Sequence, residues 1–139
     1  MPDGMKAPES SDAADWLDGA LRATPHGMGL FEPWRRLNGQ ADFRCRRANA
    51  AMRSLLGDEA LRLAEASLCQ ALAQFGAEDA LTNFIQVTET GQPRDWEMVV
   101  SGPSGSQIWR FLAVKMADDV AATLQDVTRQ RQLERASRL

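Results

Sequence analysis

The hydrophobic period of this chain changes twice along its length, and that order restricts the possible folds more than any other feature. Two short apolar runs flank Asn38-Gly39, a dipeptide typical of hairpin turns. Apolar residues then recur every three or four positions up to Thr90, and after Arg94 they alternate with polar residues. The predicted elements are strands at 26–33 and 42–47, helices at 49–57, 58–75 and 78–90, and strands at 94–101, 108–116 and 120–125. Strands at both ends and helices between them predict an α+β fold.

The two ends of the chain differ from this middle part in composition. Residues 1–10 mix Pro, Gly and charge without periodicity, which predicts a flexible tail. A helix is expected next, capped by Ser11 or Asp12 and ended by Pro25. After Thr128 the sequence is polar and helix-favouring. We therefore divide the chain into a tail (1–10), a folded domain that includes the N-terminal helix (11–127), and the start of a C-terminal helix (128–139).

Composition excludes several classes of protein. The chain has 139 residues, 16 basic against 19 acidic side chains and a net charge of −3, so it lacks the basic surface that general binding to nucleic acid needs. No apolar stretch has the length of a membrane span, and we expect no membrane insertion. Cys45 and Cys69 fit neither a metal spacing nor a disulfide framework, which favours the reducing cytoplasm. One His and no Tyr leave few groups for acid–base catalysis, so we expect no enzyme.

Four local strings make the chain resemble the PAS domain family of bacterial sensory-box proteins. These strings are Ala20 to Pro33, Asp42 to Met52, Thr88-Glu-Thr-Gly-Gln-Pro93 and Ala121 to Thr128, and they occur in the family's order and spacing. The resemblance covers residues 15 to 130. It implies a five-stranded antiparallel sheet covered on one face by the middle helices, with an N-terminal helix and a C-terminal exit helix. The stretch from Asp58 to Gly76 is more helical than the family's usual pattern.

The cofactors known in this family place specific demands on the sequence. A flavin photoadduct needs a Cys in an "NCRFLQ"-like helix, and Cys69 lacks that context, which favours a buried structural thiol. A haem site needs a His in the helix before the fourth strand, and the single His26 lies instead at the first strand. A coumarate chromophore needs phenolic partners, and the chain has no Tyr. We therefore expect no cofactor and no metal.

Two groups of residues are candidate functional sites. Phe84, Trp96, Met98 and Phe111 are expected either to line a cleft for a small apolar ligand or simply to pack the core. Asp126, Val127 and Thr128 match the family's "D-[IV]-T" ending, and the resemblance implies that the Asp ties the last strand to the exit helix and transmits a signal. The alternative is an ordinary helix cap, to which Asp126 and Thr128 would each offer a side-chain oxygen. The arginines of residues 35–53 suit either an acidic partner or a solvated strand edge.

These observations favour a non-catalytic PAS sensory and protein-interaction module in bacterial signal transduction. By the resemblance, its partner is a signalling protein or output domain, either a histidine kinase or a diguanylate cyclase. The chain is either an excised input domain or a stand-alone regulator, and both remain open. We expect a homodimer formed through the N-terminal helix or the sheet face. The alternative function is a small-molecule receptor whose occupied cleft shifts the C-terminal helix.

Overall fold

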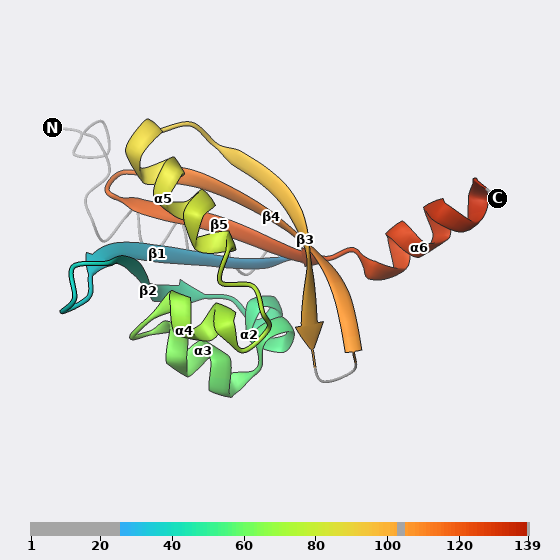
Figure 1. The fold of residues 1–139 in the computed structure, drawn as a ribbon, viewed down its shortest axis with the longest axis horizontal. Coiled ribbons are helices and arrows are strands. Elements are labelled where there is room, and N and C mark those ends of the chain that lie inside the picture. Colours follow the sequence, from blue (N-terminus) through green and yellow to red (C-terminus); the bar gives the residue numbers. More distant parts are fainter. Residues whose placement is uncertain (1–25, 103–104, 139) are drawn as a thin grey trace, which may run out of the picture.

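The computed structural model describes residues 26–102 and 105–138. They form one antiparallel sheet of five strands in the order β2-β1-β5-β4-β3, so the first and last strands along the chain meet at its centre (Figure 1). The strands are β1 (Gly27–Arg35), β2 (Ala41–Ala48), β3 (Arg94–Gly102), β4 (Gly105–Met116) and β5 (Asp119–Asp126). The predicted α+β class and the antiparallel sheet are confirmed. The expected tail and N-terminal helix lie outside the described residues.

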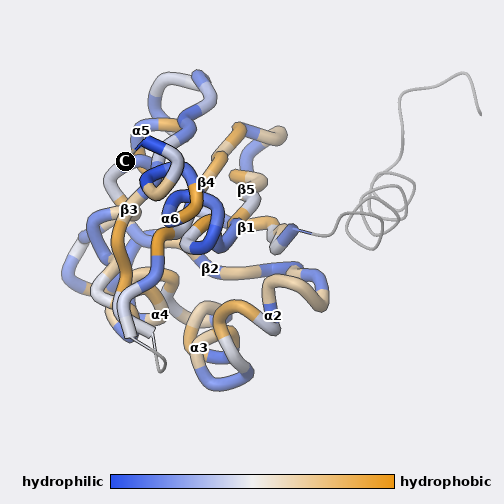
Figure 2. The backbone as a smooth tube through the Cα atoms, turned by 90° about the vertical axis from the view of Figure 1, so that its right-hand side faces the viewer, coloured by the Kyte–Doolittle hydropathy of each residue, from blue (hydrophilic) through white to orange (hydrophobic). Residues whose placement is uncertain are grey.

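Four short helices connect β2 to β3, and a fifth leaves the sheet after β5 (Figure 1). They are α2 (Ala50–Leu56), α3 (Asp58–Ala64), α4 (Leu68–Ala73), α5 (Ala80–Thr90) and α6 (Thr128–Ser137). Helix α6 has no buried residue, and its backbone is coloured as hydrophilic over most of its length in Figure 2. The exit helix is therefore held at its start and along one side rather than packed into the core.

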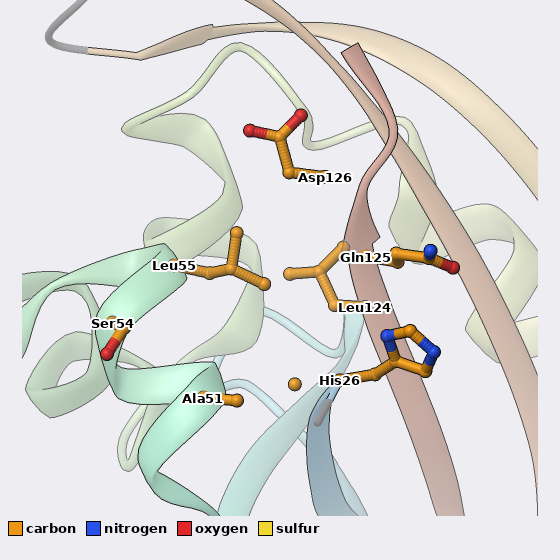
Figure 3. Close-up of a pocket in the computed structure, with 8 residues that line it drawn as sticks. His26, Ala51, Ser54, Leu55, Leu124, Gln125 and Asp126 are labelled. Carbon is orange, nitrogen blue, oxygen red and sulfur yellow. The ribbon is translucent and has the colours of Figure 1, made fainter. Parts of the chain in front are cut away.

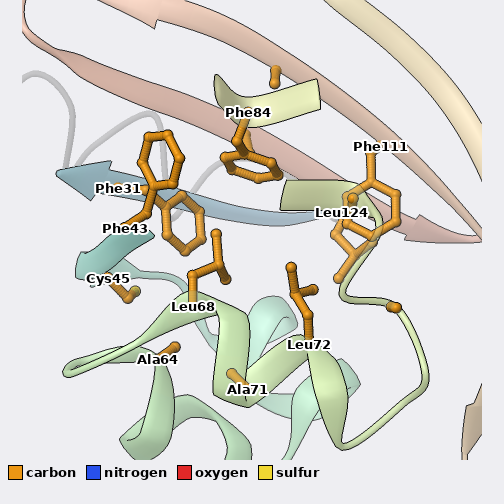
Figure 4. Packing of buried hydrophobic residues seen from close by; sticks show 14 of the residues in the cluster. Phe31, Phe43, Cys45, Ala64, Leu68, Ala71, Leu72, Phe84, Phe111 and Leu124 are labelled. Carbon is orange, nitrogen blue, oxygen red and sulfur yellow. The ribbon is translucent and has the colours of Figure 1, made fainter. Parts of the chain in front are cut away.

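The core lies between one sheet face and helices α2 to α5, and Phe84 of α5 stands at its centre (Figure 4). Its ring makes edge contacts with Phe31 and Phe43, each at a centroid distance of 5.5 Å. Along β3 the buried or half-buried positions alternate with exposed ones, as period two predicts. The core thus joins the two strand groups that are far apart in the sequence, β1–β2 and β3–β5.

The predicted single helix at 58–75 is wrong, because the chain breaks into α3 and α4 at Ser67. The backbone of Ser67 is extended (φ −156°, ψ 111°), and its hydroxyl accepts a hydrogen bond from the Gln70 amide at 3.1 Å. Ser67 is therefore the N-cap of α4, a role that helical spacing alone does not reveal. Gly57 has φ 87° and ψ 159°, a conformation that favours glycine, and it joins α2 directly to α3.

The first strand also extends past Pro33, where the sequence predicts its end. Pairing of β1 with β5 stops at Phe31, whereas pairing with β2 continues to Arg35. Pro33 therefore occupies a part of β1 that has a strand neighbour on one side only, a position where a missing amide donor is tolerated. Strand β4 begins at Gly105, three residues earlier than predicted.

Candidate functional site

Two hydrogen bonds to the backbone of one residue in the neighbouring strand β4 hold the junction between β5 and α6. The amide of Val127 donates to the carbonyl of Ile108 at 2.9 Å, and the amide of Ile108 donates to Oγ1 of Thr128 at 2.8 Å. The Thr128 hydroxyl in turn donates to Oδ1 of Asp126, which also accepts from the Thr128 amide at 2.9 Å. Val127 is 2% exposed, so its side chain anchors the junction in the interior. The three predicted residues form one continuous hydrogen-bonded unit.

The expected helix cap takes a different form from the one predicted. Asp126 does accept from the first amide of α6, but the Thr128 oxygen accepts from β4 and not from a free amide of the helix. The oxygen at Thr128 therefore links the helix start to the sheet. The first residue of α6 is thus bonded directly to the backbone of β4 through its own hydroxyl.

A second attachment joins α6 to the edge strand β3. The guanidinium of Arg131 forms an ion pair with the carboxylate of Glu97, with Nε 2.9 Å from Oε1, and it also pairs with Glu134 one turn further along α6. The hydrogen bond from Arg131 lowers the pKa of Glu97, and the same contact raises the pKa of Arg131. Both groups are partly exposed, so this contact orients α6 and is sensitive to salt.

The predicted aromatic and methionine set comes together on the α5 side of the sheet, between α5 and the β3–β4 pair. The rings of Trp96 and Phe111 stack at 4.9 Å, and Trp96 meets Phe84 edge to face at 6.0 Å. Phe84 and Phe111 are 2% and 3% exposed, which places them in the packed core. Met98 packs against the same cluster. Nε1 of Trp96 is buried and has no hydrogen-bond partner among the described residues, an arrangement that is uncommon in folded proteins.

The pocket in Figure 3 lies beside the junction and not at the aromatic set. It has a volume of about 460 Å³ and lies where the start of β1, the helix α2 and the end of β5 meet. Its lining consists of His26, Gly27, Ala51, Ser54, Leu55, Leu124, Gln125 and Asp126. Gly27 permits this close meeting of elements, since a side chain there would contact the Leu124 carbonyl oxygen and the Met52 Cα at 3.1 Å. Sequence reasoning missed this pocket, because its residues come from three distant segments.

Comparison with known proteins gives matches among solved structures only. No protein-family model and no curated protein matches the sequence. A domain of the sensory box sensor histidine kinase/response regulator from Geobacter sulfurreducens matches with a TM-score of 0.54 and 16% identity, covering 87% of this chain and all of that one. An RNA-binding Light-Oxygen-Voltage receptor matches with a TM-score of 0.60 and 16% identity, covering 99% of this chain and 40% of the receptor's length. The chain has the PAS fold.

The single histidine and the two cysteines occupy different environments within this PAS fold. His26 precedes β1 and lines the pocket beside the junction. Cys69 is partly exposed, so the expected burial of this thiol is wrong, and its amide donates to a carboxylate of β2. Cys45 is the buried thiol, and burial raises its pKa to about 11. In the part of the chain that the structure describes, no three His, Cys, Asp or Glu side chains are placed to hold a metal ion.

The arginines of residues 35–53 lie on and around β2, an edge strand of the PAS sheet, and most of them meet local partners. Arg46 pairs with Asp119 at 3.1 Å, Arg53 pairs with Asp58 at 3.4 Å, and the Arg44 guanidinium lies 4.0 Å from the ring centre of Trp34. These contacts neutralise much of the local charge. They favour the solvated strand edge over a docking surface for an acidic partner.

The buried carboxylate of Asp42 is the strongest polar feature that sequence reasoning missed. Its side chain is fully buried in β2, where Oδ1 accepts from the amides of Phe43 and Cys69 and Oδ2 accepts from the Ser67 hydroxyl at 2.5 Å. Nε of Arg36 lies 3.7 Å from Oδ2. Asp42 thus attaches the start of α4 to the edge of the sheet, and it explains why the helical stretch breaks at Ser67. In the sequence, a single acid at the start of an edge strand does not indicate that its carboxylate is buried or that it holds a helix.

None of the helices in residues 26–102 and 105–138 is both long and apolar enough to cross a bilayer.

Proposed function

We propose that this chain is a non-catalytic sensory and protein-interaction module of bacterial signal transduction, in which the sheet controls the position of α6. The observation that carries the proposal is the junction at residues 126–128. One residue of β4, Ile108, is hydrogen-bonded through both its amide and its carbonyl to the first residues of α6. A shift of the sheet is therefore transferred to the helix through short, direct contacts, which is the physical requirement for a two-state switch.

Asp126, Val127 and Thr128 are the proposed signal-transmission residues. Asp126 orients the Thr128 hydroxyl by accepting its hydrogen bond, and this leaves a lone pair of the Thr128 oxygen available to the Ile108 amide. Arg131 and Glu97 add a second point of attachment. This ion pair matters for the position of α6, because the helix buries no residue of its own. The helix therefore has a defined direction at its start and a weakly held side, which suits an element that moves.

The proposed partner is a signalling protein or output domain, either a histidine kinase or a diguanylate cyclase, reached through α6. This part rests on the PAS fold shared with the sensory box domain of a histidine kinase. We further propose a homodimer formed through the outer sheet face, where Val99, Leu112, Val114 and Met116 are 64%, 37%, 38% and 38% exposed. The free thiols of Cys45 and Cys69 support a place in the cytoplasm.

A chimera tests the transmission role. The chain is fused in frame after α6 to the catalytic core of a histidine kinase, and autophosphorylation is compared among the parent, Asp126→Ala and Thr128→Val. We expect both variants to change kinase output severalfold, while the free energy of unfolding of the unfused domain falls by only about 1 kcal/mol, the size of a helix cap. The matched control is Asp118→Ala, an exposed acid in the β4–β5 turn. Kinase output that changes only in proportion to lost stability would reduce these residues to a cap.

A small-molecule receptor is the second candidate, and the unpaired Nε1 of Trp96 favours it. A buried donor without a partner costs free energy, and a ligand with an acceptor group in the aromatic set would remove that cost. The proposed cleft residues are Phe84, Trp96, Met98 and Phe111. Such a ligand would have to separate the stacked rings of Trp96 and Phe111. A thermal-shift screen with heteroaromatic metabolites tests this, and Trp96→Phe should abolish any stabilisation that depends on the indole donor.

A further inference from the structure

The pocket beside the junction has the size and the mixed lining of a ligand site. Its volume of about 460 Å³ falls within the range of small-molecule pockets in proteins. Figure 3 shows Leu55 of α2 and Leu124 of β5 pointing toward each other across it, so that they form an apolar centre. The ring of His26 is turned away from α2 in the same view. The lining also holds the polar side chains of His26, Ser54 and Gln125, and the carboxylate of Asp126 is its one acidic group among the described residues.

One oxygen of the Asp126 carboxylate is available to a ligand. Oδ1 is occupied by the amide and hydroxyl of Thr128, whereas Oδ2 has no hydrogen bond or ion pair within the described residues. Asp126 is also exposed, so the free oxygen is accessible from solvent. A carboxylate beside an apolar wall selects for a group that carries both a positive charge and a compact hydrocarbon part. It disfavours anions, which would face the carboxylate directly.

We propose that this pocket binds a small organic cation, an amine whose ammonium group donates to Oδ2 of Asp126 while its apolar part lies against Leu55 and the end of β5. The pocket opens between α2 and the end of β5, and its lining includes none of the four residues of the aromatic set, although Leu124 is the cross-strand neighbour of Phe111. Occupancy adds a cationic donor to the carboxylate that orients Thr128. Binding at this site stands on the pocket alone. Its effect on α6 rests on the function proposed above.

Benzylamine is a suitable probe, because it combines an ammonium group with a compact ring. Benzyl alcohol and benzoate are its neutral and anionic counterparts. Titration of the ¹⁵N-labelled full chain, followed by amide chemical shifts, should show saturable changes at residues 27, 54–55 and 124–126 with benzylamine. We expect binding of benzyl alcohol to be about tenfold weaker, as for the loss of one charge-assisted contact, and no binding of benzoate.

Four variants test whether binding depends on the charge of Asp126 and on the space in the pocket. Asp126→Asn keeps the oxygen that accepts from Thr128 and removes the charge, so it should weaken benzylamine binding about tenfold. Ala51→Leu fills the pocket from α2 and should abolish binding, and Ser54→Leu does the same from an exposed position if Ala51→Leu fails to fold. Asp118→Asn removes an equal charge elsewhere on the surface and should leave binding unchanged.

The outcomes distinguish the site from the proposed function. The site is overturned if benzylamine gives no saturable shifts below about 10 mM, if benzyl alcohol binds equally well, or if Asp126→Asn binds as tightly as the parent. Amide hydrogen exchange in residues 128–137 is measured on the same samples. Saturable binding without any change in α6 exchange supports the site and counts against signal transmission through the junction, whereas binding with altered exchange supports both.

Discussion

Replacing the buried carboxylate of Asp42 should destabilise the fold more than any surface change of the same charge. The carboxylate has three hydrogen-bond donors, the amides of Phe43 and Cys69 and the Ser67 hydroxyl, and its side chain has no exposed area. Asp42→Ala leaves the Ser67 hydroxyl and the Cys69 amide without their acceptor at a site closed to water. Each buried donor left without its acceptor costs about 1–3 kcal/mol, so the two together cost roughly 2–6 kcal/mol. That is a large part of the 5–15 kcal/mol, roughly, that holds a domain folded.

The isosteric variant divides this free energy into its parts. In Asp42→Asn the Oδ1 position can still accept from the two amides, but the amide nitrogen that replaces Oδ2 faces the Ser67 hydroxyl and Arg36. Because Ser67 already accepts from Gln70, its proton loses its acceptor, and we expect a loss of about 1–3 kcal/mol. The stability of the Asn variant should therefore lie between that of the parent and that of the Ala variant. Asp118→Ala is the matched control and should change stability by less than about 0.5 kcal/mol.

Urea unfolding followed by tryptophan fluorescence and by far-ultraviolet circular dichroism measures these differences. The midpoints should shift while the dependence on urea stays the same, since the surface exposed on unfolding does not change. Native-state hydrogen exchange should show faster exchange in α4, beginning at Cys69, in both variants. A loss below about 1 kcal/mol for Asp42→Ala, or an Asn variant as unstable as the Ala variant, would refute the role assigned to this carboxylate.

Three further predictions test other parts of the structure. Phe84→Ala should lower the free energy of unfolding by about 3–5 kcal/mol, because the Phe84 ring contacts three aromatic neighbours in the core. Leu133→Ala, on the exposed side of α6, should lower it by less than about 0.5 kcal/mol. Urea unfolding midpoints compare the two variants. The hydrogen bond from Arg131 lowers the pKa of Glu97, so the ion pair should be intact at neutral pH and be lost only as pH falls through this lowered pKa. Amide exchange in α6 should rise on acidification in the parent and show no such rise in Glu97→Gln. Burial raises the pKa of Cys45 to about 11, so iodoacetamide at pH 8 should label Cys69 and spare Cys45, and labelling of Cys45 at an equal rate in the folded protein would contradict its burial.

The elements that were predicted well depend on local patterns. Alternation along β3 and helical spacing along α5 each reflect one buried face, so a short window of sequence is enough to identify them. The aromatic set could also be predicted as a group, because its members lie on the buried faces of α5, β3 and β4. The junction residues were found through the resemblance of Asp126-Val-Thr128 to a family motif. Their bonds to Ile108 could not be predicted, since they depend on the register between β4 and β5.

The sequence by itself determined the order of strands and helices, because the period of apolar residues is a local property that follows from backbone geometry. Only the tertiary structure decided the contacts that give the elements their roles. Asp42 meets Ser67 across 25 positions and Arg131 meets Glu97 across 34, and the pocket beside the junction joins residues from 26 to 126. Such contacts arise from strand register and from how helices pack on the sheet. A polar side chain looks the same in the sequence whether it is solvated or buried, and its partners exist only after folding.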